Sequence, residues 1–264
     1  MATIDLKYTR VPADKKYGES FTINSLPPKD FELFDKKMLG LGDLSMDGRY
    51  RNSLAVFLDL QGFTQFCNQV ESSLVIPEFI SRYNEWVFET IKNLFTESKT
   101  DKLVTIWGSL PFYAKFLGDG LLFLWDTDVS GGFSGICNIA INLHKLIDMY
   151  KKEFYPMIKK HVSNPPSILR CGIARGQVIS IGNGKDYVGS CINIAVRLQK
   201  ISQLTFAISR RGFDLSKLPQ HIINNHLILK NISIRGIGDD ELVYIRKDEY
   251  RKLSKEEKTF FKKT

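Results

Sequence analysis

Two aspartates in separate strand-and-turn settings could bind divalent metal. Asp59 follows the apolar run 54–58, and Asp119 lies between two glycines in the segment 118–120. Two carboxylates that converge can hold Mg²⁺ on the phosphates of a bound nucleotide. Either aspartate alone more often just ends a strand or makes a turn, so the metal-site prediction rests on the pair.

A polar pair four residues apart adds a second chemical element. Asn193 and Arg197 belong to one predicted helix, and residues at positions i and i+4 share a helix face. An arginine on that face can stabilise negative charge that develops at phosphorus in a transition state. Taken alone, the pair also fits an exposed polar stripe. Together with the aspartates, it points to chemistry on a nucleoside triphosphate.

Weaker signals surround these four residues. Gly62, Phe63 and Thr64 can offer backbone N–H groups to a phosphate, and Thr64 is also the expected N-cap of a helix from about residue 65. Lys115 and Asp186 supply a donor and an acceptor that can read opposite edges of a nucleobase, although surface charges are the commoner role of such residues. The segment 182–184 predicts a hairpin turn.

Hydrophobic periodicity predicts the elements that position these side chains. Apolar and alternating runs indicate strands, and three- and four-residue intervals indicate helices. The expected strands are 53–60, 112–116, 121–125, 167–174, 177–181, 227–234 and 241–245, and the expected helices are 77–94, 133–150 and 190–201. Gly118-Asp119-Gly120 would close a hairpin with Asp119 at its tip. This order predicts an α+β sandwich of ferredoxin-like character.

Bulk composition excludes several classes of function. The net charge of +8 resides largely in the last stretch, where Lys and Glu alternate as on a solvated surface. No nucleic-acid-binding motif accompanies that charge, and no apolar run is long enough to cross a bilayer. We therefore expect a cytoplasmic chain with neither nucleic acid nor membrane as partner.

The cysteines and histidines show no metal-binding or disulfide pattern. Cys67, Cys137, Cys171 and Cys191 are dispersed, and they are expected to be buried and reduced. His221 and His226 lie five residues apart with no second ligand pair nearby, so a zinc site there is not favoured.

Four segments, in this order, resemble the catalytic domain of class III nucleotidyl cyclases, the family of adenylate and guanylate cyclases. They are FLDLQGFT at 57–64, KFLGD at 115–119, CGIARG at 171–176 and DYVGSCINIAVR at 186–197. The resemblance covers residues 50 to 245. It implies a ferredoxin-like βαββαβ domain with a central antiparallel or mixed sheet flanked by helices. The expected layout is an N-terminal extension over 1–48, the catalytic domain over 49–245 and a basic tail or helix over 246–264.

The resemblance also implies roles for individual residues. Asp59, Leu60 and Asp119 would hold two Mg²⁺ or Mn²⁺ ions per active site, and the substrate's 3′-hydroxyl would attack its own α-phosphate and release pyrophosphate. Asn193 would orient the ribose, and Arg197 would stabilise the transition state. The remaining expected substrate contacts are Gly62, Phe63, Thr64, Lys115, Asp186 and Arg235. Arg235 occupies the neighbourhood where many members carry a triphosphate-binding lysine.

Family members build their sites at a dimer interface, so the resemblance implies a head-to-tail homodimer. The segment from Lys115 to Trp125 also looks like the stand-alone pyrimidine cyclases of the bacterial Pycsar anti-phage systems. These make cyclic UMP or cyclic CMP for a cyclic-nucleotide-sensing effector, and we favour that product. Lys115 and Asp186 match adenine-reading positions, which keeps an adenylate cyclase as the alternative. Tyr50 or Arg51 is the candidate for a bulky residue that excludes purines.

Two further hypotheses belong to other classes of protein. A catalytically inactive nucleotide-binding module could regulate a partner, but such a module would tolerate loss of the Asp59, Asp119, Asn193 and Arg197 set. A nucleic-acid-binding ferredoxin-like domain is suggested by charge alone. Binding with a steep salt dependence and no need for metal would distinguish it.

Overall fold

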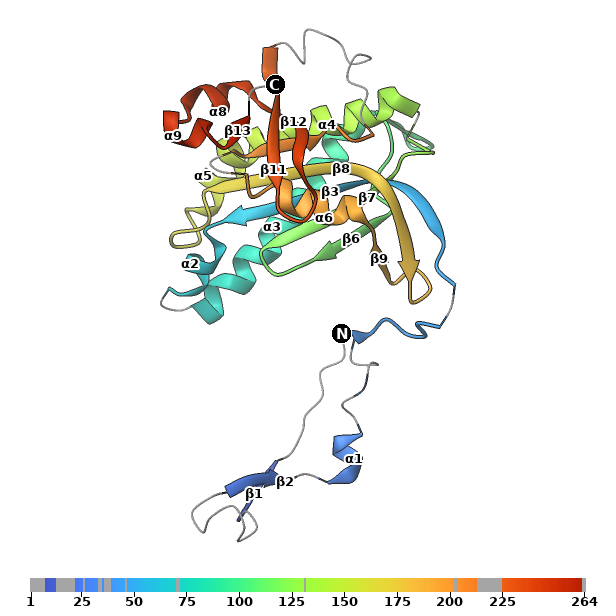
Figure 1. Cartoon of the computed structure of the whole chain (residues 1–264), viewed down its shortest axis with the longest axis vertical. Helices are drawn as coiled ribbons and strands as arrows, with labels where there is room; N and C mark the ends of the chain where they lie inside the picture. Colours follow the sequence, from blue (N-terminus) through green and yellow to red (C-terminus); the bar gives the residue numbers. More distant parts are fainter. Residues whose placement is uncertain are drawn as a thin grey trace. The chain divides into compact units, whose positions relative to one another are not determined.

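The computed structural model describes residues 8–12, 22–25, 27–32, 35, 39–45, 47–69, 72–130, 132–201, 204–212 and 225–262 (Figure 1). The chain divides into two compact units, one made of residues 1–49 with 179–187 and the other of 50–178 with 188–264. None of the helices within the described ranges is both long and apolar enough to cross a membrane.

The smaller unit combines the N-terminal segment with the tip of a long hairpin. Strand β1 (Thr9–Pro12) pairs antiparallel with β2 (Thr22–Ser25), and α1 (Pro28–Phe31) follows. The Arg49 backbone N–H donates to Ser180 Oγ at 2.9 Å. At the hairpin tip, Gly182, Asn183 and Gly184 all have positive φ angles, which confirms the predicted turn.

The larger unit is built on one sheet with the strand order β13-β11-β12-β10-β8-β3-β7-β6, and β9 pairs with β8. The strands of this sheet are β3 (Tyr50–Gln61), β6 (Tyr113–Phe116), β7 (Gly120–Asp126), β8 (Ile168–Ile181), β9 (Asp186–Val188), β10 (Phe206–Ser209), β11 (Leu227–Ile234), β12 (Gly238–Arg246) and β13 (Phe261–Lys262). The end of β8 and most of β9 belong to the smaller unit. Strand β10 runs parallel to β8 and antiparallel to β12. The segment β8-β3-β7-β6 with its two long helices is the predicted ferredoxin-like arrangement.

Helices cover the sheet on two faces. The helical elements of this unit are α2 (Phe63–Cys67), α3 (Ser72–Phe95), α4 (Gly132–Met149), the π-helical turn η3 (Tyr150–Phe154), α5 (Tyr155–Ile158), α6 (Ser190–Leu198), α8 (Lys247–Lys252) and α9 (Lys255–Lys258). The main core lies on the α3 and α4 side, where Leu54, Val56 and Leu58 of β3 are fully buried. Since side chains alternate along a strand, Phe57 and Asp59 face the other side.

Several expected boundaries were wrong. The predicted strands 167–174 and 177–181 form the single strand β8, because Arg175 and Gly176 stay extended between its two halves. Helix α3 begins five residues before Pro77, which is tolerated inside the helix at the cost of one hydrogen bond. Helix α6 ends at Leu198. Strand β10 and the separate pair β4 (Thr96–Lys99) and β5 (Val104–Ile106) were not expected.

A glycine sets the position of α6 on the second face of the sheet. A Cβ atom at Gly172 of β8 would lie 2.1 Å from the carbonyl oxygen of Ala195 and 2.8 Å from the backbone nitrogen of Gln199. Only a residue without a side chain allows backbone to approach this closely. Helix α6 therefore rests directly on β8, on the same face as Asp59.

Candidate active site

The hairpin register places the two aspartates side by side. Asp59 near the end of β3 is opposite Gly120, the first residue of β7, and the Leu60 N–H donates to the Asp119 carbonyl at 3.1 Å. Asp119 is half-buried in the loop between β6 and β7, whereas the Asp59 side chain is almost fully enclosed. Strands β3 and β7 are thus neighbours, as convergence of the pair requires.

Burial raises the pKa of Asp59 above its ordinary value, and the nearby negative charge of Asp119 raises this pKa further. Arg170 opposes both effects: its Nε and Nη2 atoms donate to Asp59 Oδ2 at 3.0 and 2.5 Å. The positive charge of Lys200 acts in the same direction as Arg170. Burial and Asp119 thus disfavour the charged form of Asp59, and cations placed beside it favour that form.

Arg170 is a site residue that the sequence reasoning missed. It lies on β8 between Leu169 and Cys171, both buried in the core on the α3 and α4 side. Alternation therefore directs the arginine to the face that carries Asp59. A charge between apolar residues near the start of a predicted central strand was the signal that could have identified it.

Helix α6 presents the predicted polar pair on its exposed side. Asn193 and Arg197 are exposed, whereas Ile194, Ala195 and Leu198 are buried against the sheet. A Cβ atom at Gly236 would lie 3.4 Å from Arg197 Nη2, so the guanidinium rests against the turn between β11 and β12. This turn also carries the exposed Arg235, and the structure therefore brings two predicted site arginines close together.

The turn after β3 differs in detail from the prediction. Helix α2 begins at Phe63, with Gly62 as its N-cap in the left-handed region at φ 83°, and no side chain caps it. Thr64 is thus inside the helix, because a left-handed glycine makes the entry without a side-chain cap. Phe63 packs on Phe66 with ring centroids 5.7 Å apart. Gly62 and Thr64 are exposed beside the metal-site candidates.

Lys115 lies apart from the aspartates within one chain. It is opposite Leu122, which is in turn opposite Phe57, so these three residues form one row across β6, β7 and β3. Two strand spacings put Lys115 about 10 Å across the sheet from β3. Asp186 belongs to the smaller unit, where its Oδ1 accepts the N–H of Tyr187 at 2.8 Å.

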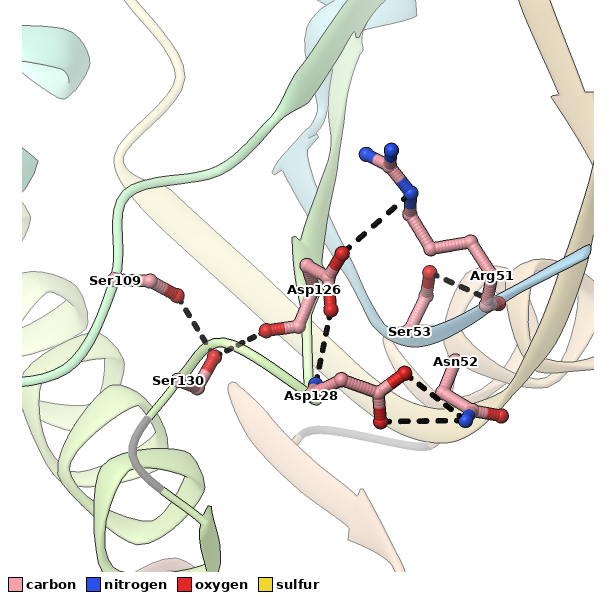
Figure 2. A network of polar contacts seen from close by, with 7 residues as sticks. All are labelled: Arg51, Asn52, Ser53, Ser109, Asp126, Asp128 and Ser130. Carbon is pink, nitrogen blue, oxygen red and sulfur yellow. Dashed lines mark hydrogen bonds and ion pairs between the residues drawn. The ribbon is translucent and has the colours of Figure 1, made fainter.

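The two candidates for base discrimination lie at the opposite end of β3 from Asp59. Figure 2 shows Arg51 in a polar network, with its Nε 3.5 Å from Asp126 Oδ2. The Arg51 guanidinium also stacks over the Phe112 ring at 4.4 Å. Six residues of extended strand, about 20 Å, separate it from the row of Lys115. Neither Arg51 nor its exposed neighbour Tyr50 lies beside Lys115 in the same chain, and their role in excluding purines stays a prediction.

The donor atoms at the candidate metal site fit a hard divalent cation. Two carboxylates and the Leu60 carbonyl are oxygen ligands of the kind Mg²⁺ and Mn²⁺ prefer, with phosphate oxygens and water completing the shell. In the described ranges, no three His, Cys, Asp or Glu side chains gather as a complete metal cage. The arrangement suits a metal that arrives with a phosphorylated substrate.

Comparison with known proteins agrees with this architecture. No protein-family model matches the chain, and no curated protein matches it significantly in sequence. Among solved structures, it is similar to the guanylyl cyclase Cya2, at 16% identity and a TM-score of 0.53 over 76% of this chain and 94% of the other. It is equally similar to the adenylyl cyclase CyaB from P. aeruginosa, at 16% identity and a TM-score of 0.53 over 79% and 100%. The larger unit thus has the α+β fold of class III cyclase catalytic domains.

Proposed function

We propose that this protein is a metal-dependent nucleotidyl cyclase that converts a nucleoside triphosphate to its 3′,5′-cyclic monophosphate and pyrophosphate. The observation that carries the proposal is the buried Asp59 beside Asp119, on the sheet face to which α6 brings its polar stripe. The pair supplies two carboxylates at neighbouring positions of β3 and the β6–β7 loop, which is the donor set that a metal-bound triphosphate needs.

The residues divide the reaction among them. Asp59, Asp119 and the Leu60 carbonyl would hold two Mg²⁺ or Mn²⁺ ions, which would supply Lewis-acid stabilisation of the phosphates. The 3′-oxygen of the substrate forms a bond to the α-phosphorus, and the bond to pyrophosphate breaks. Arg197 faces the charge that develops on the α-phosphate, and Asn193 positions the ribose.

Several hydrogen-bond donors are proposed to bind the triphosphate of the substrate. Arg170 contacts Asp59 and could turn from it to a phosphate oxygen, since guanidinium groups bind both anions through the same fork of donors. The exposed Gly62 turn and Arg235 are the other proposed contacts of the triphosphate. Lys115 and Asp186 are proposed to read the base at the site completed by a second copy of the chain.

A pyrimidine triphosphate, UTP or CTP, is the favoured substrate, and its cyclic product would act on a sensing effector in anti-phage defence. The support is the likeness of the Lys115 segment to pyrimidine cyclases. ATP is the second candidate, because Lys115 and Asp186 are the residue types that suit adenine.

The test is incubation of the full chain with ATP, GTP, CTP and UTP separately, in Mn²⁺ and in Mg²⁺, followed by mass spectrometry of the products. We expect cyclic UMP or cyclic CMP, and loss of more than about a hundredfold in rate in Asp59→Asn and Asp119→Asn. Asp101→Asn, at an exposed loop position, is the matched control and should keep full activity. Cyclic AMP alone would favour the adenylate cyclase. Unchanged turnover in both aspartate variants would refute the metal assignment.

A further inference from the structure

A second cavity lies on the opposite face of the sheet from the aspartates. It has a volume of about 690 Å³ and opens between α4, β10 and β11. Its apolar wall consists of Cys137, Ala140, Ile141, Phe206, Ile208 and Leu227. Four of these residues belong to the core on the α3 and α4 side, so the cavity is separate from the candidate active site.

The size and lining are those of a small-molecule site. Ligand pockets commonly span about 300–1,000 Å³, with mostly apolar walls and a few polar groups that orient the ligand. The polar groups come from two directions. His144 and Asp148 follow Ala140 at helical spacing on α4, and Arg246 ends β12 on the far wall.

Aromatic rings concentrate around His144. Its imidazole meets the Phe206 ring edge-to-face, with centroids 5.2 Å apart, and the His226 ring lies 5.9 Å away. Edge and face contacts at these separations are the geometry in which aromatic rings attract one another. An aromatic ligand in the cavity could therefore make edge or face contacts with the rings of Phe206, His144 and His226.

Among the described residues that line the cavity, Arg246 is paired with carboxylates. Arg246 donates from its Nη1 to Asp148 at 2.7 Å, and its Nε lies 3.4 Å from Asp248 and 3.6 Å from Glu249. Burial lowers the pKa of His144 to about 4, helped by the charge of Arg246, so its imidazole is neutral near pH 7. Lys145 also lines the cavity, but it is exposed to solvent.

An anionic ligand would gain little here, because Arg246 already contacts three carboxylates. The anion would lose its hydration without gaining a new cationic partner. The thiol of Cys137 is also a poor nucleophile, since burial raises its pKa to about 12. Ligands held by phosphate or by a covalent bond to this cysteine are therefore disfavoured.

We propose that this cavity binds an uncharged, flat aromatic molecule that carries a hydroxyl or N–H group. The ring lies between the α4 wall and Phe206, and the polar group exchanges hydrogen bonds with His144 or Asp148. The site is additional to the nucleotide site, and its existence does not depend on the proposed cyclase activity.

A matched pair of probes tests the charge requirement. Tryptophol and indole-3-acetate share the indole ring and differ in a neutral hydroxyl against a carboxylate. We expect tryptophol to bind the full chain in saturation-transfer NMR and calorimetry, and indole-3-acetate to bind at least about tenfold more weakly. Absence of tryptophol binding, or equal or tighter binding of indole-3-acetate, would overturn the proposal.

Cavity-filling variants test the location. Ile141→Trp and Leu227→Trp change half-buried residues of the wall, and either should weaken tryptophol binding at least about tenfold. Leu74→Trp, at a position that is 73% exposed, is the control and should bind as the parent chain does. Circular dichroism identifies any variant that has not folded, and the other wall variant then decides. Undiminished binding in a folded wall variant would place the probe elsewhere and refute the assignment.

Discussion

At the scale of single residues, the contact between Asp59 and Arg170 sets the electrostatic environment of the candidate metal ligand. Both donor atoms of Arg170 reach the same carboxylate oxygen, and Asp119 adds negative charge beside it. Arg197 differs, because it is exposed and rests against a glycine turn. The first arginine is thus partly buried against a carboxylate, whereas the second is accessible to a substrate.

Arg197→Lys is expected to lower kcat about a hundredfold with little change in KM. Lysine keeps the charge but lacks the rigid fork of donors, and the proposed role of Arg197 is confined to the transition state. Steady-state kinetics on the preferred nucleotide measures both constants. Arg82→Lys, on the exposed surface of α3 where Arg82 pairs with Glu78, serves as control and should change neither. A rise in KM with normal kcat would instead assign Arg197 to ground-state binding.

At the scale of elements, the contact between α6 and β8 fixes the helix that carries Asn193 and Arg197. The backbone of α6 lies so close to Gly172 that no other residue fits between them. The hairpin of β11 and β12 completes this face, since its turn holds Gly236 against Arg197. The other end of the same hairpin, where Leu227 pairs with Arg246, borders the second cavity.

Gly172→Ala should therefore destabilise the protein by about 1–3 kcal/mol and reduce turnover further than stability alone explains. Its new methyl group meets backbone atoms of α6, which must shift and carry Asn193 and Arg197 with them. Gly176→Ala is the comparison variant and should have a smaller effect on stability and turnover. Its new Cβ would lie 3.0 Å from the Cβ of Cys191, so the neighbouring atoms need to move less. Thermal unfolding and kcat are the measurements. Equal effects of the two substitutions would contradict a special role for Gly172.

The sequence predicted the elements that carry strong local signals. Periodicity identified β3, α3, α4 and the hairpin of β6 and β7, and the Asp-Gly turn of that hairpin placed Asp119 at its tip. The features that were missed lack a clear local signal. Arg175-Gly176 looks like a turn, but it stays extended within β8, and the four-residue strand β10 is too short to show a period. The pairing of Arg170 with Asp59 joins residues 111 apart, which only the tertiary fold reveals.

At the scale of the whole molecule, one chain does not bring all the predicted site residues together. Lys115 lies two strands, about 10 Å, from β3, and the aspartates are at the end of that strand. A head-to-tail pair of chains would let the aspartates of one copy meet the Lys115 row and α6 of the other. The head-to-tail homodimer with two sites is therefore a proposal that needs a direct test.

Mixing two inactive variants tests that assembly. Asp59→Asn and Arg197→Ala should each be inactive alone, and an equimolar mixture after exchange should recover about a quarter of parental activity. Half of the dimers would then be mixed, and each would contain one intact site of two. Activity of the mixture is compared with that of each variant at the same total concentration. A mixture as inactive as its components would show that each site is built within one chain.

The ion pair between Arg170 and Asp59 also bears on the life of the protein before any substrate arrives. A newly synthesised chain supplies its own counterion to the enclosed carboxylate, so it can complete folding without drawing on cellular magnesium. Fluctuations in free magnesium would then change the speed of the reaction and leave the stock of folded protein untouched. If the proposed function holds, the folded protein would accumulate without bound metal and would need metal only together with its triphosphate substrate.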